Sequence, residues 1–411
     1  MNGRTEKEKR MDTIRETIQK YIDNGDIAGA AYIVRKNGKV EAEGGLGYAD
    51  IEKQLPAGPD TLFRLASMTK PIAAIAVMKL IEDGKIRLQD KISTWLPEYR
   101  DMKVCSYRVG DEFYAPDPDS PTGAHASEKI LNEMTYVDAE REITVYDLMT
   151  HSSGIGMGPV GITLAERVSD RKDTIRERVR KYAVIPLDFQ PGTEMGYSAI
   201  VGMEILSAVI EIISGMSFDE YLEETILGPM GIRDITYSPD EEQTKRIPRL
   251  YKYTENHQLE DVTDTDYTWL IAIADPVRSM HSASAGLYGS VAAYDKIAQM
   301  LLQGGEYNGV RILKAETVEA ICQNAGEHKL WLCPGLRWGL GMVVYDDPAF
   351  LQSARSAGSY GWSGAFGTHF FVDPQNRLTA VLGINRSNIG GASSPVSFAF
   401  EKAIREELLQ E

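Results

Sequence analysis

Residues 67–82 read SMTKPIAAIAVMKLIE, a segment that opens with a serine and a lysine and is apolar on nearly all sides. The spacing of its apolar residues is helical, and a helix that is apolar all round is usually buried. Pro71 falls in the first turn, where proline is tolerated, and Gly84 stands where a C-terminal cap belongs. The segment therefore predicts a buried helix that begins at Ser67.

Strand-like segments lie near both ends of the chain. Two of them flank Asn37-Gly38, a dipeptide typical of a tight hairpin turn. Residues 368–386, THFFVDPQNRLTAVLGINR, predict two more strands joined by a Pro-Asn turn. Amphipathic helices are predicted at 11–24 and 394–409, and helical patterns dominate residues 144–230.

This order of elements predicts an α+β fold. One antiparallel sheet would be built from both chain ends and flanked by helices, with a mainly helical domain inserted. The predicted domains are a discontinuous sheet domain, residues 11–95 with 285–411, and a helical domain, residues 96–284. Residues 100–140 are polar and predict a long surface loop or an insertion. A cleft between two such domains is a common place for a site.

Composition limits what the protein does. The 411 residues carry 44 Lys and Arg against 60 Asp and Glu, a net charge of −16. A nucleic-acid or anionic membrane partner would need a basic face, so neither partner is expected. There are three cysteines without a C-x-x-C pair, no run of about 18 apolar residues and no apolar stretch behind the charged N-terminus. These features predict a cytoplasmic protein without disulfides.

Ser67 and Lys70 form an S-x-x-K pattern at the head of the predicted helix. Residues three apart share a helix face, so the serine hydroxyl and the lysine ammonium can meet. The helix N-terminus adds partial positive charge and an unpaired N–H near Ser67. A partly buried lysine can supply the base that a nucleophilic serine needs. A capping serine followed by a solvated lysine would show the same pattern, so the pattern alone leaves both interpretations open.

Two further segments could complete such a site. Tyr197 lies between a Pro-Gly turn and an apolar helix, from where it could point into a cleft. Beside a lysine its phenolate form is favoured, and it could act as a general base. Residues 361–367, GWSGAFG, form a glycine-rich entry to the strand that begins at Thr368, and such an entry lets a substrate approach backbone N–H groups. One of these groups could pair with the N–H of Ser67 as an oxyanion hole.

Other patterns carry less weight. Residues 156–161 match G-x-G-x-x-G, but a helical pattern rather than a strand precedes them, which argues against a dinucleotide site. The six histidines are scattered, and no cofactor and no metal are expected. His151 is interpreted as hydrogen-bonded within the fold, and His369 as a satisfied core histidine.

Taken together, these segments resemble the serine β-lactamase and penicillin-binding-protein superfamily, in which S-x-x-K is a known motif. Within it the chain is most similar to class C β-lactamase-related serine hydrolases, especially family VIII carboxylesterases and related acyltransferases. The resemblance extends over most of the chain and rests on six segments in the family's order. These are FRLASMTKPIAA (63–74), GKIRLQDKISTWLPEY (84–99), ITVYDLMTHSSGIG (143–156), FQPGTEMGYSA (189–199), SASAGLYGSVAAYDKIAQMLL (282–302) and GWSGAFGTHFFVDP (361–374).

The resemblance implies a β-lactamase/transpeptidase-like fold and a role for each matching residue. Ser67 would be the acylated nucleophile, while Lys70 and Tyr197 would share its proton and keep each other's pKa low. The backbone N–H groups of Ser67 and Ala365 would form the oxyanion hole. The substrate pocket would be lined by residues of the last segment: Trp362, Ser363 and Gly364.

Two positions depart from the family's pattern. The tyrosine motif of class C β-lactamases is Tyr-x-Asn, whereas this chain has Tyr197-Ser198-Ala199 and lacks the Asn amide. The third motif is usually Lys-Thr-Gly, and Trp362 replaces the cation that would receive a β-lactam carboxylate. Both changes favour a neutral or apolar ester, and we expect weak or absent β-lactamase activity.

The sequence therefore predicts a serine hydrolase that cleaves small-molecule carboxylic esters through a covalent acyl-enzyme on Ser67. A β-lactamase or D-amino acid peptidase is an alternative. So is an acyltransferase with a specific small-molecule acceptor, because transfer and hydrolysis share the acyl-enzyme. A non-catalytic ligand sensor on the same scaffold is a further alternative, against which the retention of Ser67, Lys70 and Tyr197 argues.

Overall fold

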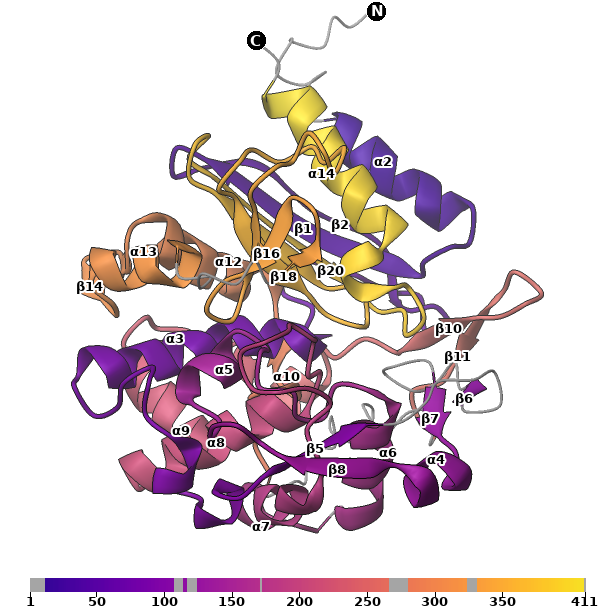
Figure 1. The fold of residues 1–411 in the computed structure, drawn as a ribbon. Coiled ribbons are helices and arrows are strands. Elements are labelled where there is room, and N and C mark those ends of the chain that lie inside the picture. The colour runs from indigo at the N-terminus through magenta and orange to yellow at the C-terminus, as the bar shows by residue number, and fades with distance from the viewer. Residues whose placement is uncertain are drawn as a thin grey trace, which may run out of the picture.

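The computed structural model describes residues 12–106, 114–116, 124–170, 172–265, 280–323 and 331–409. Within them, strands from the two chain ends form one sheet, and helices from the middle of the chain gather below it (Figure 1). The predicted α+β fold, with an antiparallel sheet built from both chain ends, is confirmed.

The sheet has nine strands in the described part of the chain, in the order β15-β16-β17-β18-β19-β20-β1-β2-β3, and neighbouring strands are antiparallel. In chain order they are β1 (Gly29–Lys36), β2 (Lys39–Asp50), β3 (Leu55–Pro56), β15 (Trp331–Cys333), β16 (Leu336–Trp338), β17 (Val343–Tyr345), β18 (Tyr360–Ser363), β19 (His369–Asp373) and β20 (Leu378–Ile384). The β1–β2 hairpin turns at Asn37 and Gly38, both with positive φ, as the dipeptide predicts. The sheet thereby joins residues that lie more than 300 positions apart, such as Ala30 and Ile384.

Helices cover both faces of this sheet. On one face α2 (Asp12–Asp23) and α14 (Pro395–Leu408) lie side by side (Figure 1). On the other face α12 (Val291–Leu302) packs against β1, β19 and β20. Successive side chains of a strand point to opposite faces. In β19, for example, Phe370 packs in the same core as α12, whereas Phe371 packs in the core shared with α2 and α14.

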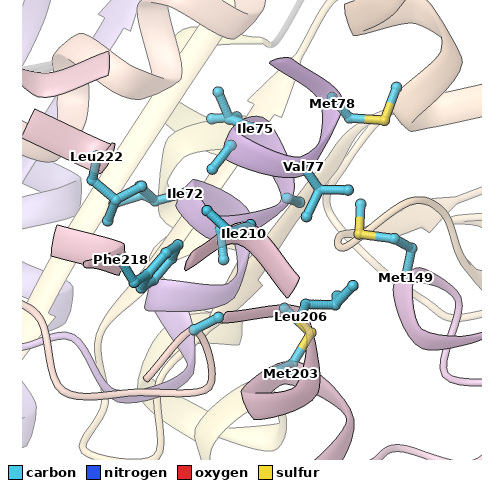
Figure 2. Packing of buried hydrophobic residues seen from close by; sticks show 14 of the residues in the cluster. Ile72, Ile75, Val77, Met78, Met149, Met203, Leu206, Ile210, Phe218 and Leu222 are labelled. Carbon is cyan, nitrogen blue, oxygen red and sulfur yellow. The ribbon is translucent and has the colours of Figure 1, made fainter. Parts of the chain in front are cut away.

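Helix α3 (Thr69–Glu82) lies in the core that also contains α12. Its residues from Ile72 to Met78 are almost completely buried, as an apolar segment without a polar face predicts. Figure 2 shows Ile72 and Val77 of α3 in one packed cluster with Leu206 and Ile210 of α8 (Val201–Ser214). Although α3 precedes residue 96, it packs among the helices, and the domain boundaries proposed from the sequence stay a prediction.

The other elements are short. The helices are α4 (Glu128–Glu133), α5 (Val145–Met149), α6 (Pro159–Val168), α7 (Ile175–Lys181), α9 (Phe218–Leu222), α10 (Glu241–Thr244) and α13 (Ala315–Gln323). The small sheets are β4 (Phe63–Arg64) with β12 (Tyr288–Gly289) and β9 (Ile235–Thr236), β5 (Lys103–Ser106) with β8 (Thr135–Asp138), β6 (Tyr114–Pro116) with β7 (Ala124–Ala126), β10 (Tyr251–Tyr253) with β11 (Leu259–Asp261), and β13 (Glu306–Tyr307) with β14 (Val310–Arg311).

Residues 100–140 hold more regular structure than a long surface loop would, so that alternative is wrong for the described part of the segment, whereas an insertion stays a prediction. Two antiparallel strand pairs and α4 lie within it. The segment folds because a few apolar side chains, among them Val104 and Ile130, are buried within an otherwise polar stretch. Residues 117–123, DPDSPTG, lie outside the described residues.

No single helix in the described part of the chain is long and apolar enough to cross a membrane. One bent pair, α8 with Phe218–Leu227, passes the same test of length and composition, with an angle of 74° between its parts. Residues Val201 to Ile210 of α8 are buried in the core that contains α3.

Candidate active site

Ser67 stands on a tight turn that leads directly into α3. Residues Ala66 to Met68 form one 3-10 turn, and Lys70 lies in the first turn of α3. Ala66 has a φ of 45°, a left-handed conformation that costs free energy for a residue with a Cβ. Lys70 Nζ lies 3.1 Å from Ser67 Oγ. The two groups meet, as their spacing on a helix predicts.

Lys70 is completely buried, and in the described residues no carboxylate lies within ion-pair distance of its amine. Burial lowers the pKa of Lys70 to about 7, and the Glu204 carboxylate opposes this shift only in part. The amine donates a hydrogen bond of 2.8 Å to the carbonyl oxygen of Ser284. Near neutral pH a large fraction of Lys70 is therefore the free amine, whose lone pair can accept a proton from Ser67.

Tyr197 reaches Ser67 from the segment before α8, three residues ahead of the N-cap of that helix. Its hydroxyl donates to Ser67 Oγ over 3.0 Å and accepts from Trp362 Nε1 over 3.2 Å. Burial raises the pKa of Tyr197 to about 12, and its hydrogen bonds with Ser67 and Trp362 oppose the rise in part. The expectation that Lys70 and Tyr197 keep each other's pKa low is therefore wrong for the tyrosine. Tyr197 is a neutral phenol that can donate a proton.

The proposed oxyanion donors are available. In the described part of the chain, neither the N–H of Ser67 nor that of Ala365 donates to a protein acceptor. Ala365 lies in the turn between β18 and β19, and the turn is closed by a 2.7 Å hydrogen bond from the Gly364 N–H to the Thr368 carbonyl. The glycine-rich stretch differs from the predicted strand entry in one respect. Its first three residues belong to β18 and pair with β19, because small Gly361 lets the strands approach closely.

Aromatic rings surround the Tyr197 side chain. The ring centres of His151, Trp362 and Trp338 lie 4.8, 5.2 and 5.5 Å from that of Tyr197. Trp338 is completely buried and donates from Nε1 to the Met149 carbonyl, which fixes its orientation. This apolar wall shields the Tyr197 side chain from water, and burial is the largest cause of the raised pKa of Tyr197.

His151 does not have the hydrogen bonds that the sequence interpretation gave it. Both of its ring nitrogens are buried without a hydrogen-bond partner in the described residues. The ring instead lies edge-on to Tyr197 and Trp338, an arrangement that stabilises aromatic pairs. Burial and the charge of Lys70 hold the pKa of His151 well below its ordinary value, so the ring is neutral and adds to the apolar wall.

Ser363 and His369 lie on the other face of β18 and β19. The Ser363 hydroxyl is 2.7 Å from His369 Nδ1. His369 Nε2 lies 3.0 Å from Arg355 Nη2 and 3.0 Å from Oε1 of Glu401, a residue of α14. His369 is thus a satisfied core histidine, as predicted. Ser363, in contrast, is engaged behind the sheet, whereas its neighbour Trp362 faces Tyr197. The structure therefore brings Ser67, Lys70, Tyr197 and Trp362 together. The Ser363 hydroxyl instead contacts His369 on the other face of the sheet, so the predicted place of Ser363 in the substrate pocket is wrong for this hydroxyl.

The buried ion pair behind this strand predicts a large effect on stability. Burial alone would raise the pKa of Glu401, but Arg355 and His369 hold it at about 2. Arg355→Leu leaves this carboxylate buried without its cation, which should lower the free energy of unfolding by about 3–5 kcal/mol in urea titrations. Arg311→Leu is the control, because its ion pair with Glu306 is exposed, and it should cost no more than about 1 kcal/mol. Equal effects of the two variants would contradict the prediction.

The groups that bind and surround the Lys70 amine were not predicted from the sequence. Ser284 supplies the carbonyl acceptor, and its hydroxyl lies 2.7 Å from that of Ser282. Ser282 in turn donates to Glu204, a completely buried carboxylate on α8 that also accepts from the Tyr182 hydroxyl at 2.7 Å. Ser284 thus takes over the support of Lys70 in a chain that lacks the Asn of the tyrosine motif. One signal was present: the charged residue Glu204 lies inside the apolar run of α8.

The fold, with a serine, a lysine and a tyrosine gathered at the start of a buried helix, defines the class as a serine hydrolase. A model of the Beta-lactamase family matches residues 14–393, and the chain belongs to that family. Esterase EstB of Burkholderia gladioli is 27% identical over 400 residues, with 92% of this chain and 91% of the esterase covered.

Solved structures of the same fold include one described as a hydrolase and one described as a carboxylesterase. EstCE1, described as a hydrolase with promiscuous acyltransferase activity, has a TM-score of 0.78 and 22% identity, and 97% of this chain and 99% of that chain are covered. A family VIII carboxylesterase has a TM-score of 0.73 and 21% identity, with coverage of 97% and 98%. These two similarities support the β-lactamase/transpeptidase-like fold.

Proposed function

We propose that the protein hydrolyses small-molecule carboxylic esters through an acyl-enzyme on Ser67. The observation that carries the proposal is the position of Ser67 Oγ, which lies 3.1 Å from the Lys70 amine and 3.0 Å from the Tyr197 hydroxyl. One neighbour is a base near neutral pH and the other is an acid, because burial moves their pKa values in opposite directions. The similarity to Esterase EstB supports the same reaction class.

Acylation follows from these contacts. Ser67 Oγ attacks the ester carbonyl carbon while its proton passes to Lys70, and the negative charge on the carbonyl oxygen is met by the N–H groups of Ser67 and Ala365. The bond to the alcohol then breaks, and the departing alkoxide takes a proton from the Lys70–Tyr197 pair. In deacylation a water molecule attacks the acyl carbon, its proton goes to the same base, and Ser67 is released with its proton restored.

The preference for esters over β-lactams rests on the strand beside the nucleophile. Trp362 stands where a β-lactamase has the cation for a substrate carboxylate, and its indole is packed against Tyr197 and Trp338. Ala199, where the Asn amide would be, packs with Ile200 and Ala285 in a small apolar cluster. A substrate with a carboxylate would lose hydration at these positions without gaining a charged partner.

The test is intact-mass spectrometry after incubation with a fluorophosphonate, together with turnover of p-nitrophenyl butyrate and of nitrocefin. We expect one adduct on Ser67, no adduct on Ser67→Ala, ester turnover that depends on Ser67, and little loss of nitrocefin. Fast nitrocefin hydrolysis would contradict the proposed substrate class. Absence of both adduct and turnover would favour a ligand sensor, and ester synthesis that dominates when an alcohol is added would favour an acyltransferase.

A further inference from the structure

We propose that Thr368 is a positioning residue that sets the distance between the two oxyanion donors, the N–H groups of Ser67 and Ala365. The inference rests on the proposed acyl-enzyme reaction. It concerns a residue that touches neither the substrate nor the reacting atoms. Thr368 would act through the two backbone segments that it connects.

The first contact reaches the segment that carries the nucleophile. Thr368 is almost completely buried, and its Oγ1 donates a hydrogen bond of 3.0 Å to the carbonyl oxygen of Leu65. Leu65 stands two residues before Ser67, and the same carbonyl accepts from the Met68 N–H at 2.9 Å. The Thr368 hydroxyl therefore holds the tight turn in which Ser67 lies.

The second contact holds the segment that carries the other donor. The Thr368 carbonyl accepts from the Gly364 N–H at 2.7 Å, and the Gly364 carbonyl accepts from the Gly367 N–H at 3.0 Å. These bonds close the turn that contains Ala365. One threonine thus bonds through its side chain to the segment that carries Ser67 and through its main chain to the turn that contains Ala365, two parts of the chain about 300 residues apart.

Gly364 allows the turn that contains Ala365 to lie close to the segment that carries Ser67. A Cβ at this position would overlap both the Thr368 Oγ1 atom and the Leu65 carbonyl oxygen. Glycine is therefore required for the Thr368–Leu65 hydrogen bond to form. Leu65, Gly364 and Thr368 thus form one contact, which sets the distance between Ser67 and the turn that contains Ala365.

Such a contact matters more for rate than for stability. A single neutral hydrogen bond contributes modestly to folding. Oxyanion donors, in contrast, act only when they lie about 2.7–3.1 Å from the developing charge, and removing one donor slows an enzyme by about 10²–10³-fold. A displacement of about 1 Å can cost a comparable factor. Loss of the Thr368 hydroxyl should hence lower kcat while the fold persists.

The experiment compares Thr368→Val, which keeps the shape but removes the hydroxyl, with Thr368→Ser, which keeps the hydroxyl. For p-nitrophenyl butyrate we expect kcat of Thr368→Val to fall by about 10–100-fold, with KM changed by less than about threefold. Thr368→Ser should retain kcat within about threefold of the wild type. Urea titration of each variant reports whether the fold is intact.

Three outcomes would overturn the proposal: wild-type kcat in Thr368→Val, an equal loss in Thr368→Ser, or a loss confined to KM. The rate of Ser67 labelling by a fluorophosphonate is a second measurement that needs no ester turnover, since the phosphoryl oxygen occupies the same hole. If the wild type is labelled but does not turn over esters, the proposed function fails. Slower labelling of Thr368→Val, but not of Thr368→Ser, would still support the role of Thr368, and equal labelling rates would overturn it.

Discussion

Lys70→Met should lower kcat for p-nitrophenyl butyrate by about 10⁴-fold, close to the loss expected from removing Ser67 itself. The methionine fills the same buried space but has no lone pair to accept the Ser67 proton. In the wild type, kcat/KM should rise with pH through about 7, because the pKa of Lys70 is lowered to about 7 and only the neutral amine is a base. The measurement is a pH–rate profile from pH 5 to 9, and the rising limb should be absent from the residual activity of the variant.

Two controls define this prediction. Lys70→Arg keeps the positive charge but cannot lose a proton, so it should be as inactive as Lys70→Met. Because Ser67 and Lys70 act as a unit, Ser67→Ala/Lys70→Met should be no slower than Ser67→Ala alone. Activity of Lys70→Met within tenfold of the wild type would show that Lys70 is not the base.

Tyr197→Phe should produce the second large loss, and its size should depend on the alcohol that leaves. The Tyr197 hydroxyl lies 3.0 Å from Ser67 Oγ, and a pKa raised to about 12 keeps it protonated throughout the working range. An alkoxide needs that proton to depart, whereas p-nitrophenolate departs without it. We therefore expect kcat to fall by about 10²–10⁴-fold for ethyl butyrate and clearly less for p-nitrophenyl butyrate. Initial rates on the two esters are the measurement.

Trp362→Phe is the matched control for the tyrosine. It preserves the aromatic packing but removes the Nε1 donor that lies 3.2 Å from the Tyr197 hydroxyl. Its effect should be smaller than that of Tyr197→Phe on both esters, since the tyrosine keeps its proton. Equal losses of Tyr197→Phe on the alkyl and the aryl ester would refute an acid role for Tyr197.

Much of the fold could be predicted because the relevant signals are local. The Asn37-Gly38 turn and the apolar run after Ser67 each depend on residues that are neighbours in sequence. The structure has the hairpin at the predicted turn, and α3 begins at Thr69, two residues after the predicted start, because the preceding residues form a 3-10 turn. The S-x-x-K spacing likewise placed Ser67 and Lys70 within hydrogen-bond distance. The short strands within residues 100–140 were missed because a three- or four-residue strand is decided by its partner strand.

The environment of the site was less predictable than its members. The support of Lys70 by the Ser284 carbonyl has no signature in the sequence, because every residue has a carbonyl. The rise in the pKa of Tyr197 depends on how deeply three distant rings bury the phenol, and the partners of Ser363 depend on which sheet face it occupies. These properties arise from tertiary packing and become visible only when the chain is folded.

The burial of Lys70 also constrains how this chain can evolve. A lysine whose pKa falls from 10.5 to about 7 on folding binds fewer protons in the folded state. It therefore lowers stability increasingly as pH falls from 10.5 towards 7, and by a constant amount below that. Neutral replacements at this position relieve the penalty and abolish the base in one step. Selection for greater thermal stability must consequently act elsewhere in the protein, for as long as its chemistry is retained.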